Sequence, residues 1–313
     1  MHVVTGLLSP LPELASPVAT LGAFDGVHRG HQQVLRATVD WAAELDGSTL
    51  VVTFDPLPKA VVGPGDAACI TSLPHRLLLL ERCGVDLAIV LAFDQALQAM
   101  AAEEFVRRVL LGWLGARHLV LGRNSTFGHR GAGNLELLQR LEADGVLQVR
   151  SPQPVVHGAR VVSSTAIRQA IAGGDLAAAA AMLGRPFSLL GAVVPGDGRG
   201  RSLGFPTANL DLHHEAVPPN GVYATTVDLD GRPYPALTYI GSRPTFESPA
   251  APPIAEVHLI GFDGDLYGRD LEVAFLRRLR DDVRFPSAAA LIVQMKADRR
   301  AALDAYNAAN PPP

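Results

Sequence analysis

The sequence predicts an α/β protein with two modules: a parallel sheet covered by helices, then an antiparallel β-barrel that ends in a helix. The chain has 313 residues, enough for two domains of roughly 150 residues each. Short apolar runs alternate with helical patterns up to about residue 185, and strand-like segments separated by tight turns follow. We therefore expect one domain at residues 1–185 and a second at residues 186–313.

The first half alternates strands with helices. Strands are expected at residues 20–24, 48–54, 85–93, 116–122 and 146–152. Helical patterns occupy residues 31–45, 74–84, 101–115, 133–145 and 176–182. Repeated βαβ units form parallel sheets with helices on both faces. Ligands of such sheets bind at the carboxyl ends of the strands, so functional residues are expected there.

The second half changes to strands with Asp-Gly turns at Asp230-Gly231 and Asp263-Gly264. The expected strands are residues 188–194, 221–229, 234–241, 255–262 and 270–276. Residues 287–307 have helical spacing and good helix formers, and three prolines follow at the end of the chain. This order predicts an antiparallel barrel with a C-terminal helix.

Composition excludes several classes of protein. Hydrophobic residues make up 48% and charged residues 19%, which is typical of a globular protein. The formal net charge of -4 gives no general attraction to nucleic acid or to an acidic membrane. We therefore expect small-molecule partners, no nucleic acid and no membrane, and leave weak self-association open.

Cysteine usage and the start of the chain bear on the compartment. Cys69 and Cys83 lack the spacing of a zinc site or of a disulfide framework. The N-terminal segment has no basic start followed by an apolar core, and no run approaches about 18 apolar residues. A cytoplasmic protein is expected.

The segment GAFDGVHRGH at residues 22–31 places two histidines where a predicted strand gives way to a helix. A helix N-terminus has free N–H groups and the positive end of its dipole, which favour phosphate. His28 and His31 are three residues apart and would face the same anion. The alternative is an ordinary turn with two surface histidines.

The segment SSTAIR at residues 163–168 opens another helix and places Arg168 one turn from its start. Capping residues followed by a guanidinium suit a polyphosphate. Alone the signal is weak, because Ser and Thr cap most helices. Together with the paired histidines it predicts a nucleotide site.

The segment GDGRGRSLGFPTAN at residues 196–209 is rich in glycine and ends in a hydroxyl and an amide two residues apart. On an extended strand, Thr207 and Asn209 point to one face and can reach a single cation, while the glycines leave N–H groups open to phosphate. The alternative is a loop that enters an ordinary strand.

These segments resemble the bacterial bifunctional riboflavin kinase/FMN adenylyltransferase (FAD synthetase) family, whose first module is an HxGH nucleotidyltransferase. In the first module the resemblance rests on residues 22–31, 51–56, 121–134 and 163–168. It implies that ATP binds across the two helix starts while the FMN phosphate attacks the α-phosphorus and pyrophosphate leaves. The implied catalytic residues are His28, His31 and Arg168, and the implied ATP and FMN contacts are Gly22, Phe24, Asp25, Gly26, Asn124, Phe127, Gly128, Ser164 and Thr165.

The second module resembles the riboflavin kinase module of the same family at residues 196–209, 219–223, 240–246 and 255–259. This implies a six-stranded Greek-key barrel that uses ATP. Thr207 and Asn209 would serve Mg²⁺, and Glu256 would accept the proton of the ribityl hydroxyl. The other implied nucleotide and flavin contacts are Gly196, Gly200, Arg201, Gly204, Pro206, Tyr223 and Arg280. A lone strand Glu is otherwise usually solvated, and Arg280 could equally sit in a charged loop.

The sequence departs from the family's pattern at a few positions. Leu57 stands where relatives often carry His, and Ser125 replaces an aromatic, which should weaken or redirect flavin or adenine binding. Tyr239 stands where many relatives carry Asn, and Gly261 where many carry Asp; neither is one of the residues assigned to chemistry.

The hypothesis is an enzyme that phosphorylates riboflavin to FMN and then adenylylates FMN to FAD. One alternative is a riboflavin kinase whose first module is inactive or uses another flavin or nucleotide. A second is a flavin-binding protein without catalysis, which would need no base such as Glu256. The oligomeric state, the flavin redox preference, transfer of flavin between modules and the face of the sheet that carries Glu256 stay open.

Overall fold

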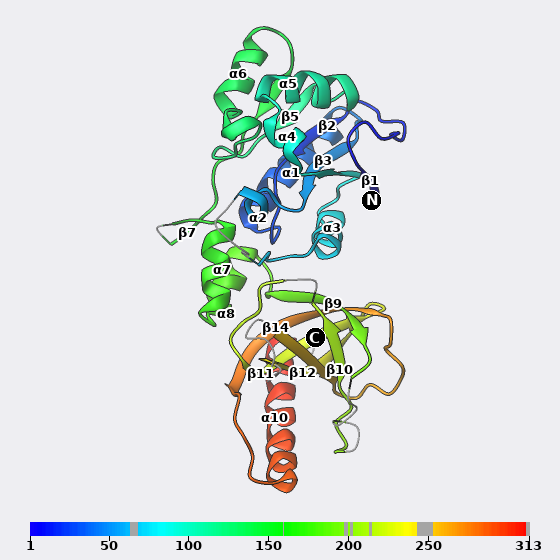
Figure 1. Ribbon diagram of the computed structural model, residues 1–313, viewed down its shortest axis with the longest axis vertical. Coiled ribbons are helices and arrows are strands. Elements are labelled where there is room, and N and C mark those ends of the chain that lie inside the picture. The colour runs from blue at the N-terminus through cyan, green and yellow to red at the C-terminus, as the bar shows by residue number, and fades with distance from the viewer. Residues whose placement is uncertain are drawn as a thin grey trace. The chain divides into compact units, whose positions relative to one another are not determined.

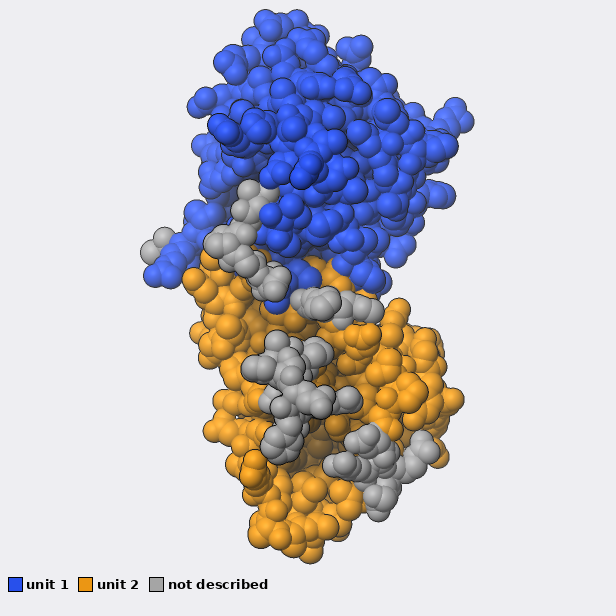
Figure 2. Space-filling model, in the orientation of Figure 1, with its two compact units in different colours: residues 1–69, 73–164 blue, residues 70–72, 165–313 orange. Residues whose placement is uncertain are grey.

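The computed structural model describes residues 1–62, 68–158, 160–196, 200, 203–212, 215–242 and 253–310 (Figure 1). The chain divides into two compact units, coloured separately in Figure 2. Unit 1 comprises Met1–Cys69 and Leu73–Ser164, and unit 2 comprises Ile70–Ser72 and Thr165–Pro313. The predicted domain boundary at residue 185 stays a prediction.

Unit 1 contains a six-stranded, fully parallel sheet in the order β1-β4-β3-β2-β5-β6. Its strands are β1 (His2–Thr5), β2 (Val18–Leu21), β3 (Thr49–Asp55), β4 (Leu87–Ala92), β5 (His118–Val120) and β6 (Gln148–Arg150). The five predicted strands and their parallel arrangement are confirmed. The edge strand β1 was not predicted, because it is short and mostly exposed and so lacks a buried apolar run.

The remaining elements of unit 1 are mostly helices. They are α1 (Arg29–Glu44), α2 (Pro58–Val62), α3 (Leu73–Arg82), α4 (Gln95–Ala99), α5 (Ala102–Glu104), the π-helix η1 (Phe105–Trp113), the short 3-10 turn η2 (His129–Gly131) and α6 (Leu135–Ala143), with a small hairpin of β7 (Val156–His157) and β8 (Arg160–Val161). The helices predicted between the strands are all present.

Apolar side chains cover both faces of this sheet. Leu50 of β3 packs in a core that includes Leu110 of η1. Its neighbour Val51 points the other way, into a second core that includes Leu35 of α1. Successive strand residues point to opposite faces, so a continuous apolar run is required when helices cover both. The predicted helical layers on both faces are confirmed.

Unit 2 begins with part of α7 (Ser164–Ala172) and α8 (Leu176–Leu183), which lead into a closed antiparallel barrel. The barrel strands are β9 (Ser188–Val194), β10 (Ala208–Asp211), β11 (Gly221–Leu229), β12 (Arg232–Ser242), β13 (Pro253–Leu259) and β14 (Asp270–Asp281), in the closed order β10-β13-β12-β11-β14-β9. This arrangement is a six-stranded Greek key, as the resemblance implied, and α10 (Ala288–Ala309) is the C-terminal helix.

The two faces of the barrel wall carry different packing. Tyr223, Thr225 and Thr238 are fully buried, and the two threonine hydroxyls hydrogen-bond to each other at 2.8 Å. On the outer face, Val222 and Ala302 of α10 belong to one apolar cluster. The helix therefore covers part of the outside of the barrel, against β11, β12 and β14.

A buried carboxylate joins a distant segment of the chain to the barrel. Oε1 of Glu215 accepts hydrogen bonds from the backbone N–H of Ser72 at 2.7 Å and from its hydroxyl at 2.6 Å. Oε2 accepts from the N–H of Leu190 at 3.1 Å. Glu215 is only 3% exposed, so these donors would be left in a dry environment without it.

Glu215→Ala should therefore destabilise unit 2 by about 3 kcal/mol, because it leaves buried donors without an acceptor. Glu215→Gln keeps an amide oxygen and should cost less. Hydrogen exchange resolved by peptide checks this, with faster exchange expected in β9 than in the strands of unit 1. Exchange in β9 no faster than in the exposed control variant Asp263→Ala would contradict the assignment.

Candidate active sites

The turn between β2 and α1 presents the paired histidines. Phe24, Gly26 and Val27 have positive φ angles of 49°, 81° and 37°, so the chain reverses in a conformation that side chains rarely adopt. His28 is the N-cap of α1, and its Nδ1 accepts a hydrogen bond from the N–H of His31 at 3.3 Å. The predicted helix start at these residues is confirmed.

The two histidine rings lie together, as the spacing predicted. Their centroids are 3.6 Å apart with an interplanar angle of 16°. The rings of Phe24 and His31 meet edge to face, with their centroids 5.2 Å apart. Burial lowers the pKa of His31 well below 6.5, and the nearby His28 and Arg76 lower it further. A Cβ on Gly30 would lie 3.1 Å from the His28 ring, so the absence of a side chain at Gly30 leaves room for this ring.

The second predicted phosphate segment begins beside this turn. Ser164 is the first residue of α7, and its hydroxyl donates to the carbonyl oxygen of Asp25 at 3.1 Å. Asp25 itself is 3% exposed. Thr165 and Arg168 follow on the same helix, and the boundary between the two units passes between Ser164 and Thr165. Their predicted ligand contacts stay predictions.

The loop after β5 carries three further predicted site residues. Asn124 is exposed, whereas Phe127 is buried in the sheet core with its ring centroid 6.0 Å from that of Phe105. Gly128 has φ 71°, and a Cβ there would meet the backbone of Ala102. In the described structure, Phe127 therefore contributes to packing, and Asn124 is the side chain of this group that faces solvent.

In unit 2, strand register brings the predicted kinase residues together. Asn209 of β10 lies directly opposite Glu256 of β13, and Glu256 lies opposite Tyr239 of β12. Residues directly opposite in antiparallel strands share one face. Glu256 is half-buried between the fully buried Ala255 and Val257, so the row occupies the outer face of the barrel. This resolves the face that sequence left open.

Two glycines lie against the predicted metal residues. A Cβ on Gly196 would overlap the amide of Asn209, and a Cβ on Gly200 would lie 3.2 Å from the Thr207 hydroxyl. At Gly196 the backbone thus approaches the Asn209 amide at a distance that only glycine allows, and at Gly200 a Cβ would overlap the carbonyl oxygen of Phe205. Arg201, predicted to contact the same ligand, lies outside the described residues.

The neighbouring Phe205-Pro206 segment is anchored to β13. Nδ1 of His258 hydrogen-bonds to the carbonyl of Pro206 at 2.8 Å, and the rings of His258 and Phe205 meet edge to face at 5.4 Å. Burial lowers the pKa of His258 below 6.5. Gly204 is exposed with φ 82° and supplies the turn before this anchor.

The donor set fits a hard divalent cation. Thr207 offers a hydroxyl, Asn209 an amide oxygen, and Glu256 a carboxylate beside Asn209. Mg²⁺ prefers oxygen ligands and usually keeps waters and substrate phosphates in its shell, so few protein ligands suffice. Among the described residues no group of three His, Cys, Asp or Glu could hold a metal. Thr207, Asn209 and Glu256 are the residues that would hold such a cation.

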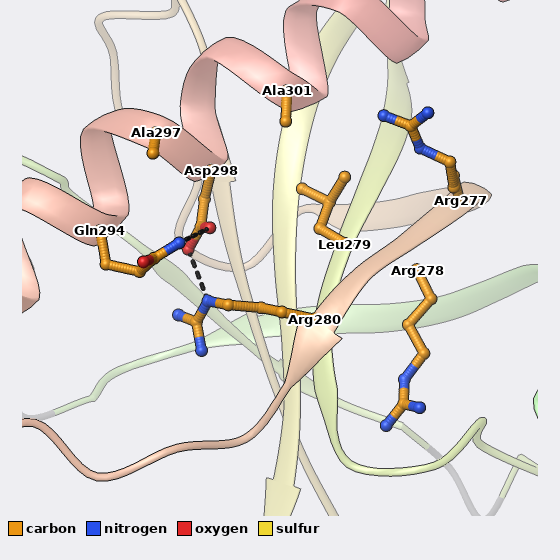
Figure 3. Close-up of a pocket in the computed structure, with 8 residues that line it drawn as sticks. All are labelled: Arg277, Arg278, Leu279, Arg280, Gln294, Ala297, Asp298 and Ala301. Atoms are coloured by element: carbon orange, nitrogen blue, oxygen red, sulfur yellow. Dashed lines mark hydrogen bonds and ion pairs between the residues drawn. The ribbon is translucent and has the colours of Figure 1, made fainter.

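The predicted ligand residue Arg280 lines a cleft of about 350 Å³ between β14 and α10 (Figure 3). Its Nε donates to Oδ2 of Asp298 at 2.9 Å, and Gln294 donates to Oδ1 of the same carboxylate at 2.8 Å. The guanidinium also lies 5.4 Å from the ring of Phe285. Tyr223, by contrast, is fully buried, with its hydroxyl bonded to the Pro219 carbonyl.

Sequence reasoning missed several residues that shape these sites. The Tyr239 hydroxyl donates to Asp282 at 3.0 Å, and the ring lies over Gly241. Burial, with the carboxylates of Asp282 and Glu256, raises the pKa of Tyr239 to about 12. For Asp298, the spacing of four from Gln294 on a helix was an available signal. The sequence offers no signal that would predict the contact between Tyr239 and Asp282.

Both arrangements suit chemistry at phosphorus: stacked imidazoles at a helix start in one unit, and oxygen donors under a glycine-rich segment in the other. The class of protein is a transferase of phosphorus-containing groups. In addition, no helix of the described residues is long and apolar enough to cross a bilayer.

Comparisons with known proteins narrow this class. A model of the FAD synthetase family matches residues 12–166, and one of the riboflavin kinase family matches residues 183–306. A bifunctional riboflavin kinase/FMN adenylyltransferase of Pseudomonas fluorescens is 40% identical over 96% of this chain and 97% of its own length. The protein of the same name from Escherichia coli K12 is 35% identical over 99% of this chain and 100% of its own length. The chain belongs to the bifunctional riboflavin kinase/FMN adenylyltransferase family.

A solved structure supports the fold over nearly the whole chain. It is titled a macrolide-efflux protein from Streptococcus pneumoniae and is 31% identical, with a TM-score of 0.83. The match covers 97% of this chain and 99% of that one. The two units therefore occur together in one solved chain.

Gly196→Ala should lower riboflavin kinase turnover at least about tenfold, because the added methyl displaces the Asn209 amide. FAD formation from supplied FMN should be unchanged in the same preparation. Gly268→Ala is the control, since a Cβ there meets nothing within 4 Å although the glycine has φ 73°. Steady-state kinetics of both steps check this, and equal losses in the two variants would refute it.

The stability of unit 2 should fall as the pH drops, partly through His258. Its folded pKa lies below 6.5, so the unfolded chain takes up the proton first. The contribution is complete above pH 6.5 and is lost as the pH falls below it. His258→Asn keeps a donor for Pro206 but does not titrate, so unfolding measured between about pH 7.5 and about pH 5.5 should show a shallower decline. A curve parallel to that of the wild type and of exposed His157→Asn would contradict this.

Proposed function

We propose that residues 1–185 form FAD from FMN and ATP, and that residues 186–313 form FMN from riboflavin and ATP. The chain carries both activities of its family, because an FAD synthetase model and a riboflavin kinase model match it side by side. The helices α7 and α8 occupy the segment around the end of the first match and the start of the second. This division assigns both to the adenylyltransferase domain.

The kinase step uses the outer face of the barrel. Glu256 accepts the proton of the ribityl hydroxyl as that oxygen attacks the γ-phosphorus of ATP and ADP leaves. Thr207 and Asn209 would hold Mg²⁺, which when bound neutralises charge on the phosphates. The observation that carries this proposal is the register of Asn209 opposite Glu256 with glycine backbone against the Asn209 amide.

The flavin lies along the same face toward α10. Asp298 holds Arg280 at the cleft, and this supports the proposal that Arg280 contacts the flavin. Gly196, Gly200 and the unplaced Arg201 would face the ATP phosphates. Exposed Gly204 and Pro206 lie in the segment that leads to Thr207.

The adenylylation step uses the turn between β2 and α1. His28 and His31 contact the ATP phosphates at the helix start, where N–H groups and the helix dipole stabilise negative charge. An oxygen of the FMN phosphate attacks the α-phosphorus and pyrophosphate leaves, so positioning and charge stabilisation suffice. Ser164, which belongs to the same unit as the two histidines, would add a contact from the start of α7. The roles implied for Thr165 and Arg168 stay predictions.

The alternatives fit less well. A riboflavin kinase whose first module is inactive or uses another flavin or nucleotide is disfavoured. Residues 12–166 match the FAD synthetase model despite Leu57 and Ser125, and the relatives that are similar over the full chain are named as bifunctional. Ser125 caps a tight turn in which its N–H donates to the Gly122 carbonyl at 2.9 Å. A flavin-binding protein without catalysis needs no carboxylate at Glu256. We further propose that the protein works in the cytoplasm on small molecules, without nucleic acid or membrane.

Glu256→Gln should lower FMN formation about 100-fold or more and leave FAD formation from supplied FMN intact, because only the kinase step needs this base. His28→Ala should do the reverse, by about 100-fold, since it removes a phosphate contact from the other step. Coupled assays of ADP and pyrophosphate release measure both. Loss of both steps in either variant, or of neither, would overturn the division.

A further inference from the structure

Arg76 of α3 is a buried cation that the proposed mechanism does not use. Only 1% of the residue is exposed, and it is the largest of the fully buried side chains among the described residues. Burying a charge is costly unless the charge is hydrogen-bonded or paired. The position of its guanidinium therefore needs an explanation.

The guanidinium binds two backbone carbonyls at the carboxyl edge of the sheet. Nη1 donates to the oxygen of Ala23 at 3.0 Å, and Nη2 donates to that of Phe54 at 2.9 Å. Ala23 begins the turn that follows β2, and Phe54 lies at the end of the neighbouring strand β3. A planar fork can hold both oxygens in a fixed relation, which the single point charge of a lysine cannot.

The turn that Arg76 holds is the strained one. It passes through positive φ at Phe24, Gly26 and Val27 before it reaches the N-cap at His28. Such backbone conformations persist only when the surrounding structure enforces them. The hydroxyl of Thr53 also donates to the Ala23 carbonyl at 3.3 Å, so this oxygen is held from two sides.

The charges around Arg76 complete the arrangement. The carboxylates of Asp25 and Asp55 and the Cys69 thiol favour its charged form against the cost of burial. On the other side, Arg76 and His28 are the charged neighbours that lower the pKa of His31 beyond the effect of burial. Nε of Arg76 has no hydrogen-bond partner among the described residues. The side chain is thus held through Nη1 and Nη2, with its charge beside the histidines.

We infer that Arg76 is a positioning residue for adenylyl transfer: it fixes the Ala23 carbonyl and thereby the turn that presents His28 and His31 to the nucleotide. Its charge adds to burial and to His28 in lowering the pKa of His31. This inference rests on the proposed role of the two histidines. Arg76 is not among the site residues predicted from the sequence. Arg76 does not touch the reacting atoms, because it is buried behind the turn.

The test compares Arg76→Met, which loses both fork and charge, with Arg76→Lys, which keeps the charge. Relative to wild type, kcat/KM for ATP in FAD formation should fall about 100-fold in R76M and about tenfold in R76K, with a raised KM for ATP. FMN formation in the same samples should stay within about twofold. Arg82, exposed on the same helix, supplies the matched controls Arg82→Met and Arg82→Lys, which should be unchanged.

The pH profile separates positioning from a merely structural role. The acidic limb of FAD formation should move to higher pH in R76M, because His31 loses a cationic neighbour, and should stay in place in R76K. Both tryptophans, Trp41 and Trp113, lie in unit 1, so their fluorescence reports whether that unit is folded.

The inference is overturned if FAD formation is retained. It is equally overturned if the activity of R76M falls only in proportion to its folded fraction, with the KM for ATP and the acidic limb unchanged. If R76M does not fold, the KM and kcat of R76K in FAD formation decide whether the inference holds. His28→Ala distinguishes the two levels of the account. If that variant loses FAD formation while the Arg76 variants keep it, only the role of Arg76 fails. If His28→Ala keeps it, the proposed site itself fails.

Discussion

The register between β10 and β13 is the constraint on which the kinase half of the molecule depends. It places Asn209 directly opposite Glu256, and Tyr239 continues the row on β12. A slip of one residue in either strand would send one of these polar side chains into the barrel, where apolar residues such as Ala255 and Val257 are now buried. The buried interior thus fixes the outer row, and the pairing that stabilises the barrel also places the candidate kinase residues side by side.

The α/β unit also places its candidate site residues through its fold, but with a strand, a turn and a helix start. Its histidines lie at the carboxyl edge of a parallel sheet: His28 is the N-cap of α1, and His31 is in the first turn of that helix. In both units the backbone comes close to the functional side chains: Gly30 borders the ring of His28, and Gly196 borders the amide of Asn209. Glycine lets the backbone come this close, and the open N–H groups of such segments suit phosphate.

Sequence patterns predicted most of the fold because periodicity reports burial. Strands β2 to β6 of the sheet, the covering helices, the barrel and the C-terminal helix follow from apolar runs and turn residues. The edge strand β1 escaped because exposed residues carry no such signal. The paired histidines could be predicted because spacing along one helix start determines their contact, which the structure shows at 3.6 Å between ring centroids.

The remaining site features depend on contacts between segments far apart in the chain. Arg76 binds Ala23 and Phe54, and Tyr239 binds Asp282, through geometry that no local pattern encodes. The position of Glu256 on the outer face of the barrel could be assigned only once the register of β10, β13 and β12 was known. Phe127 was predicted as a ligand contact because it belongs to a family motif, yet in the structure its side chain packs in the core.

The most direct measurement is a crystal structure of the chain with ADP, Mg²⁺ and FMN. The account predicts nucleotide phosphates beside Thr207 and Asn209, and the phosphate end of FMN within hydrogen-bond reach of Glu256 on the outer face of the barrel. Nucleotide bound elsewhere in unit 2, or a flavin whose ribityl chain lies far from Glu256, would contradict it.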